Sequence, residues 1–185
     1  MTGELISNER LQAESLELER IFHGNPSGID NAVAAERGAF LYTKVGGASR
    51  LTLPETKVVV LDSGKPGNTK SMVEGVASKL EANLPTLAKL GAITEEALLQ
   101  LDSPTAIGEL MNRAHSGLRE LGVSNARLND LVQFSIKHGA IGAKLSGAGG
   151  GGVVVALTPC GGERLIAEAR SRGIRHYKCT LSSRI

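Results

Sequence analysis

The sequence predicts an α+β fold, and the order of its apolar patterns carries this prediction. From residue 56 onward, β-branched runs and amphipathic runs follow one another as strand, helices, strand, strand, helix, strand. Only the first interval between strands holds more than one helical pattern. That order is typical of the split βαβ, ferredoxin-like arrangement, here with extra helices inserted in its first half.

The first fifty-odd residues do not fit into that unit. Residues 8–22 have the leucine spacing of a helix, and Asn25-Pro26 then suit the cap and first position of a second helix. Residues 39–45 and 49–53 read as two short strands around a Gly-Gly pair. Because an isolated two-stranded ribbon is marginally stable, we expect this segment to belong to a further domain.

The later elements each carry their own start and stop signals. Ser103-Pro104 and Ser124 are placed to begin helices that end at Gly122 and Gly139. The predicted elements are a strand at 56–64, helices at 68–80, 103–122 and 124–139, strands at 141–146 and 153–157, a helix at 161–173 and a strand at 174–181.

Composition excludes several classes of function. Net charge is only +2 and aromatic residues make up 3% with no Trp, so neither a duplex-binding face nor a base-stacking platform is expected. The basic tract at 170–178 suits a helix C-terminus instead. No apolar run approaches a membrane span, and two cysteines, Cys160 and Cys179, indicate no disulfide framework. These features favour a cytoplasmic protein that binds neither nucleic acid nor membrane.

One loop resembles a phosphate-binding P-loop incompletely. In "GKPGNTKS", Gly64, Lys70 and Ser71 match the pattern G-x-x-x-x-G-K-[ST], but Thr69 replaces the second glycine. A β-branched residue resists the backbone conformation often needed there. Asn68 or Thr69 as a helix N-cap explains the stretch equally well.

A second loop is a stronger candidate for binding an anion. Residues 147–152 contain five glycines between two strands, whereas a simple hairpin needs only two turn residues. Such a run costs conformational entropy on folding, but it can present successive backbone N–H groups to a phosphate. We therefore favour a ligand-binding role over a relaxed hairpin loop.

Two acids near the N-terminus are ambiguous by themselves. Asp30 follows "HGNPSGI" near a predicted helix start, where it would interact favourably with the helix dipole. It could equally accept a hydroxyl proton in phosphoryl transfer. Glu19, eleven residues earlier, could share a cation with it. Spacing alone does not choose between these interpretations.

Four segments together resemble one family. "LERIFHGNPSGIDNAVA" is similar to the E-R-x-x-H-G-x-P-S-G-x-D-N motif of the mevalonate kinases, and "KLSGAGGGG" to their third, C-terminal motif. Between them, "DSGKPGNTKSMV" and "LGVSNARLNDLV" resemble two further segments in the same order. The resemblance runs from about residue 17 to 157. It implies the superfamily of galactokinase, homoserine kinase, mevalonate kinase and phosphomevalonate kinase.

The resemblance implies roles for individual positions. Asp30 would be the catalytic aspartate that interacts with the 5-hydroxyl of mevalonate, Thr69 would lie near phosphoryl transfer, and Glu19 would bind Mg²⁺. The substrate side would be lined by His23, Gly24, Pro26, Ser27 and Gly28. The nucleotide ATP would be bound by Lys144, Ser146, Gly147, Ala148, Gly149, Gly150 and Gly151.

The chain also departs from the family. Mevalonate kinases carry an N-terminal half with a lysine beside the catalytic aspartate and a Gly-Leu-Gly-Ser-Ser phosphate loop, and no such sequence occurs here. Residues 1–54 would then be the tail end of an N-terminal kinase domain, and residues 55–185 the C-terminal kinase domain.

We therefore expect the isolated chain to bind ATP poorly, because transfer depends on neutralising the γ-phosphate. The expected function is ATP-dependent phosphorylation of mevalonate to 5-phosphomevalonate in isoprenoid biosynthesis. A homodimer or a complementary N-terminal half would be its partner. The alternatives are a non-catalytic remnant that binds a metabolite or partner and, more remotely, a divergent P-loop NTPase.

Overall fold

The computed structural model describes residues 10, 14–15, 17, 38–43 and 45–182. The chain divides into two compact units, Met1–Leu53 with Ser182–Ile185, and Pro54–Leu181. The helices expected at 8–22 and after Asn25 fall largely or wholly outside the described residues. That the first segment is the tail end of a kinase domain stays a prediction.

The described part of the first unit contains a β-hairpin. Strand β1 (Ala39–Thr43) pairs antiparallel with β2 (Gly47–Leu51), and Ala39 lies opposite Leu51. The backbone N–H of Gly46 donates to the Thr43 hydroxyl oxygen at 2.8 Å and closes the turn. Both strands were expected, although Gly47, placed in the turn from the sequence, instead begins β2.

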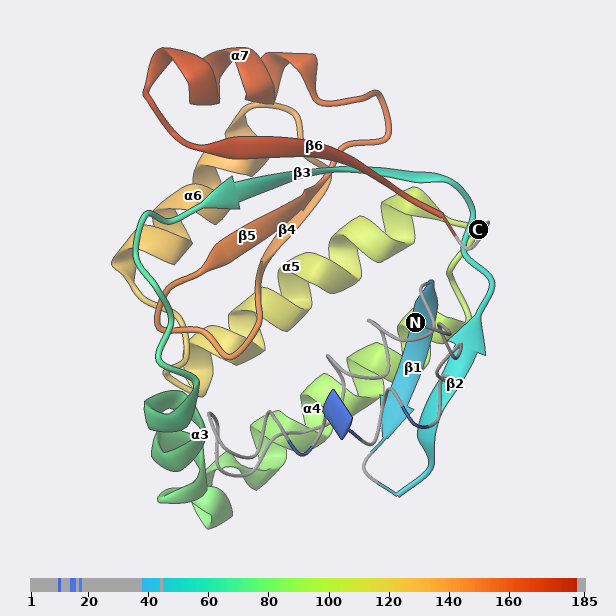
Figure 1. Ribbon diagram of the computed structural model, residues 1–185, viewed down its shortest axis with the longest axis vertical. Coiled ribbons are helices and arrows are strands. Elements are labelled where there is room, and N and C mark those ends of the chain that lie inside the picture. Colours follow the sequence, from blue (N-terminus) through green and yellow to red (C-terminus); the bar gives the residue numbers. More distant parts are fainter. Residues whose placement is uncertain (1–9, 11–13, 16, 18–37, 44, 183–185) are drawn as a thin grey trace, which may run out of the picture. The chain divides into compact units, whose positions relative to one another are not determined.

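The second unit is built on a four-stranded antiparallel sheet (Figure 1). Its strands are β3 (Thr56–Asp62), β4 (Gly142–Ser146), β5 (Val153–Leu157) and β6 (His176–Leu181), in the order β4-β5-β3-β6. The parallel pairs β3/β4 and β5/β6 are each separated by one intervening strand. Each βαβ unit is therefore split by a strand of the other, which confirms the ferredoxin-like prediction.

Helices α6 (Ala126–Lys137) and α7 (Glu163–Ser171) cover one face of this sheet and form the main core. Alternation along β3 turns Val59 and Leu61 toward these helices, and both side chains are fully buried. They pack with Leu128, Leu131, Val132, Ala143, Leu145, Val154, Ala156, Leu165 and Ala169.

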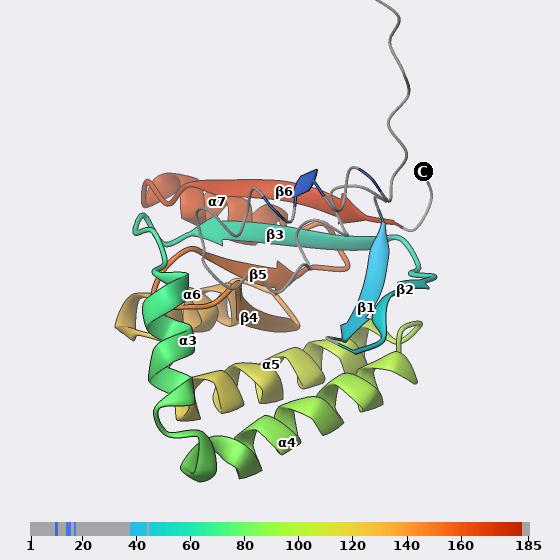
Figure 2. The same ribbon diagram turned by 60° about the horizontal axis from the view of Figure 1, so that its bottom comes forward.

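Helix α5 (Pro104–Glu120) protects the exposed edge of the sheet. Figure 2 shows it beyond β4, with α4 (Leu80–Leu98) packed on its far side. The Asn112 amide donates to the Ile141 carbonyl and its oxygen accepts from the N–H of Ala143, at 3.3 and 3.0 Å. The N–H of Leu145 donates to the Nδ1 atom of His115 at 3.5 Å. Side chains of α5 thereby pair backbone groups that an edge strand otherwise leaves open.

Helix α4 is an element that the sequence analysis did not predict. It contains Pro85, which removes one backbone donor, and its first residue has no side-chain cap. Its helical state depends on packing, because Ile93 is buried in a cluster with Leu110 and Ala114 of α5. Among the described residues, no helix combines the length and the apolar character that crossing a bilayer requires.

Candidate functional site

The glycine-rich loop at 147–152 joins β4 to β5. Gly147, Gly149, Gly150 and Gly152 have φ of +82°, +92°, +72° and +79°, which side chains with a Cβ rarely adopt. The glycines are therefore required by the backbone path of this loop.

One side of the loop is held by the turn between α5 and α6. The N–H of Gly150 donates to the Val123 carbonyl at 2.8 Å, and the Asn125 amide donates to the Gly150 carbonyl at 2.9 Å. Asn125 is also the N-cap of α6, where its side chain accepts from the N–H of Leu128. A Cβ on Gly149 would collide with the Val123 carbonyl oxygen, so backbone meets backbone directly here.

The other side of the loop is held by the segment after β3. Ser63 N–H donates to the Gly152 carbonyl at 2.9 Å, and Gly152 N–H donates to the Lys65 carbonyl at 2.8 Å. A Cβ on Gly151 would lie 2.6 Å from the carbonyl oxygens of both Lys65 and Pro66. The two loops singled out in the sequence therefore lie against each other.

Helix α3 (Thr69–Ala77) begins beside this contact. Asn68 is its N-cap, and the Asn68 side-chain oxygen accepts from the N–H of Ser71 at 3.0 Å. Thr69 is the first helical residue and is exposed. A Cβ on Gly150 would meet the Met72 sulfur at 3.1 Å, which places the first turn of α3 against the glycine loop.

This arrangement argues against the P-loop alternative. The Walker A loop operates in a strand–loop–helix unit of a parallel sheet, whereas β3 pairs antiparallel with both neighbours. Asn68 acting as the N-cap accounts for the "GKPGNTKS" stretch instead.

The structure also places the two remaining predicted nucleotide-binding residues of β4. The Lys144 ammonium donates to the Leu145 carbonyl at 2.9 Å, and burial lowers the pKa of that ammonium. Ser146 ends β4 immediately before the glycine loop and is half-buried.

A polar network around buried His115 supports the turn that holds the loop. The His115 Nε2 atom lies 3.1 Å from the Asn129 side-chain oxygen, which also accepts from the Ser124 hydroxyl at 2.8 Å. With Nδ1 accepting from Leu145, Nε2 is the protonated nitrogen of a neutral ring. Burial is the main cause that lowers the His115 pKa. The charges of Arg119 and Lys144 also lower it, against the hydrogen bond to Asn129, which raises it.

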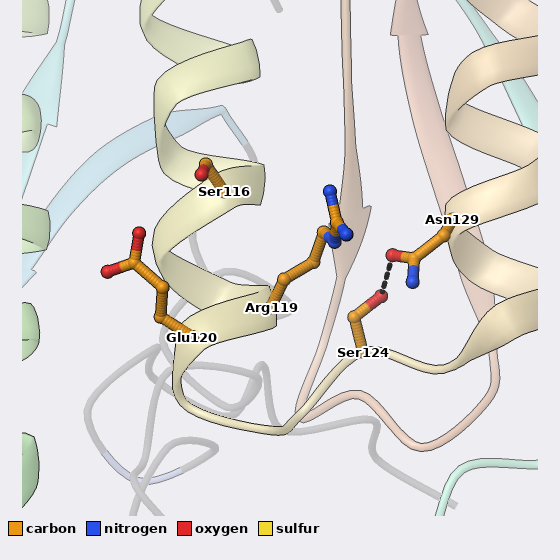
Figure 3. Close-up of a pocket in the computed structure, with 5 residues that line it drawn as sticks. All are labelled: Ser116, Arg119, Glu120, Ser124 and Asn129. Carbon is orange, nitrogen blue, oxygen red and sulfur yellow. Dashed lines mark hydrogen bonds between the residues drawn. The ribbon is translucent and has the colours of Figure 1, made fainter.

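Figure 3 shows a pocket of about 450 Å³ beside this network. Ser116, Arg119 and Glu120 come from α5, Ser124 from the turn and Asn129 from α6, and Figure 3 shows Arg119 extending toward Ser124 and Asn129. Neither His115 nor this pocket was predicted from the sequence. The only sequence signal near it was the "LGVSNARLNDLV" segment.

Seven predicted site residues lie outside the described residues: Glu19, His23, Gly24, Pro26, Ser27, Gly28 and Asp30. Thr69, Lys144, Ser146 and 147–151 are described, and the structure brings the glycine loop to the start of α3. Within the part of the chain that is described, no cluster of three or more His, Cys, Asp or Glu side chains could hold a metal ion.

Comparison with known proteins bears on the same region. Residues 95–175, which include α5, α6 and the glycine loop, match the family described as GHMP kinases C terminal. The chain is 39% identical over 180 residues to a mevalonate kinase of Pyrococcus horikoshii and 38% identical over 175 residues to that of Pyrococcus abyssi. These matches cover 91% and 89% of the chain, and 53% and 52% of the relatives.

A solved structure is similar over nearly the whole chain. The crystal structure of the L. major mevalonate kinase in complex with R-mevalonate has a TM-score of 0.87 at 26% identity. The match covers 97% of this chain and 60% of that one. The chain spans about half the length of the curated relatives that it matches. The sequence motifs, the split βαβ sheet and these matches agree, and the chain therefore belongs to the GHMP kinases and carries their C-terminal domain.

Proposed function

We propose that the chain contributes the C-terminal part of a kinase that transfers the γ-phosphoryl group of ATP to mevalonate. The observation that carries the proposal is the glycine loop, held on both sides by backbone hydrogen bonds. The similarity to mevalonate kinases, one of them crystallised with R-mevalonate, supports this substrate.

The loop has donors available for a phosphate group. The N–H groups of Gly150 and Gly152 are used by the Val123 and Lys65 carbonyls. Among the described residues, the N–H groups of Gly147, Ala148 and Gly149 have no hydrogen-bond acceptor. Three successive donors, two of them on the positive-φ residues Gly147 and Gly149, would form the concave arrangement that binds anions. They would bind and orient the phosphates of ATP.

The chemical step is assigned through the family resemblance. The 5-hydroxyl oxygen of mevalonate would form a bond to the γ-phosphorus while the bond to the ADP oxygen breaks. Asp30 would accept the hydroxyl proton, and Thr69 would lie near the transferred group. Glu19 would hold Mg²⁺, whose charge supports phosphoryl transfer when it is bound. The location in the cytoplasm also stays part of this proposal.

The decisive test is activity in a reconstituted enzyme. Formation of 5-phosphomevalonate and ADP would be measured with the 185-residue chain alone and with an added N-terminal half from a related kinase. We expect product only in the mixture. Its absence in both, with the chain folded, would favour the non-catalytic remnant.

A matched pair of variants then tests Asp30. Asp30→Ala should reduce turnover of the reconstituted enzyme at least about a hundredfold, since general-base catalysis contributes roughly 10²–10⁴. Asp130→Ala, which removes an exposed acid on α6, should leave turnover unchanged. Full activity of Asp30→Ala would refute the catalytic assignment.

A further inference from the structure

A second pocket lies beside the segment 63–66, which follows β3 and holds one side of the glycine loop. Its volume is about 560 Å³, within the usual range for small-ligand sites. Its walls come from the end of β3 and the segment after it, the start of β5, the start of α6 and residues 173–175, which precede β6. Its charged lining residues are Asp62, Lys65, Arg127 and Arg175.

The pocket concentrates positive charge. Three cations and one carboxylate leave a surplus of two positive charges, as large as the net charge of +2 of the whole chain. Arg175 forms an ion pair with Asp62, with 3.4 Å between Nη1 and Oδ2. The other Asp62 oxygen accepts from the N–H of Gly64 at 2.8 Å. The single acid is therefore engaged, and it leaves two cations uncompensated.

These two cations are on separate segments and are positioned differently. The Arg127 Nε atom donates to the Ser63 carbonyl at 3.4 Å, which directs the guanidinium toward the segment after β3. The Lys65 ammonium has no partner among the described residues. Both residues line the pocket, and guanidinium and ammonium groups together are suited to bind an anion with several oxygens.

We propose that this pocket binds a small phosphate-bearing anion, at a site separate from the N–H groups of Gly147–Gly149. The surplus of two charges matches the charge of a phosphate dianion. The site is also connected to the loop, because the Lys65 carbonyl accepts from Gly152 and Gly152 lines the pocket. An anion held by Lys65 and Arg127 stabilises the segment against which the glycine loop rests.

The test uses the full chain and two probes, pyrophosphate and glycerol phosphate, titrated calorimetrically at low salt. If only pyrophosphate binds, the site takes an inorganic ion. If glycerol phosphate binds as well, the site takes a phosphorylated metabolite. Lys65→Gln and Arg127→Gln should each weaken binding roughly ten- to a hundredfold, as expected for the loss of a charge-assisted hydrogen bond. Arg164→Gln on α7, an exposed arginine outside the pocket, is the matched control and should bind normally.

Amide chemical shifts locate the bound probe. We expect pyrophosphate to shift the N–H signals of Gly64, Gly173 and Arg175, all of which line the pocket. Shifts confined to Gly147–Gly149, or affinity unaffected by both substitutions, would overturn the proposal. Since no step of this test requires phosphoryl transfer, its failure is distinguishable from failure of the proposed function.

Discussion

Substituting single glycines in the 147–152 loop tests whether backbone contacts hold the loop in shape. Gly147 and Gly149 have similar positive φ, +82° and +92°. A Cβ on Gly147 meets nothing within 4 Å, whereas one on Gly149 collides with the Val123 carbonyl. The two alanine variants therefore share the conformational strain and differ only in the steric overlap.

The expected costs follow from these two terms. Left-handed backbone costs an alanine about 1–2 kcal/mol, so Gly147→Ala should lower the free energy of unfolding by that amount. Overpacking adds about 1–3 kcal/mol, and because the obstacle is a backbone carbonyl, Gly149→Ala should fall in the upper part of the combined range. For a chain of this size, each kcal/mol corresponds to about 2–4 °C in Tm.

Gly151→Ala completes the comparison, because its φ is not positive but its Cβ would lie 2.6 Å from two carbonyl oxygens. It should therefore show the packing cost without the conformational one. Urea unfolding followed by circular dichroism would measure all three variants. Equal losses for Gly147→Ala and Gly149→Ala would refute the reasoning, since the Val123 contact would then contribute nothing.

Three other predictions concern stability. First, the lowered His115 pKa means that the unfolded chain binds a proton near pH 6.5 that the folded chain excludes. The stability that comes from the neutral His115 ring should therefore be present above pH 6.5, and the free energy of unfolding should fall on acidification by at most about 1.4 kcal/mol per pH unit. Urea unfolding measured from pH 7 to 5 should show a flatter slope for His115→Gln. Second, Asn68→Ala removes the N-cap of α3 and should cost about 1 kcal/mol in thermal unfolding, whereas Asn68→Asp, which keeps the capping oxygen, should not. Third, both ring nitrogens of buried His138 lack partners among the described residues, so His138→Leu should raise stability by about 1 kcal/mol; a loss above that size would reveal a hidden partner.

Helices whose ends carry capping or helix-stopping residues were predictable from the sequence. Ser103 and Pro104 mark the start of α5, and periodic leucines mark its length. Helix α6 was also predicted, although its cap is Asn125 and not the neighbouring Ser124. Helix α4 was not, because Pro85 and Gly91 weaken its local signals and its stability comes from packing on α5.

The site was predictable only in part for a similar reason. Five glycines in six positions indicate a special backbone path whatever surrounds them. The groups that hold this path are the carbonyls of Val123 and Lys65. Every residue has a backbone carbonyl, so the amino-acid sequence cannot show which carbonyls make these contacts. His115 likewise acts through partners on β4 and α6 that are distant in sequence.

Among the described residues, the groups that hold the glycine loop lie within residues 54–181. Lys65 and Ser63 hold one side, Val123 and Asn125 hold the other, and β4 and β5 fix the two ends. Each of these supports is a backbone group or a capping side chain of the second unit. The N–H groups of Gly147–Gly149, which we propose bind phosphate, are therefore held in place before an anion arrives, and binding should require little further ordering. We therefore expect residues 54–181 alone to retain the loop amide shifts of the full chain, and a changed pattern would show that groups outside this unit complete the loop.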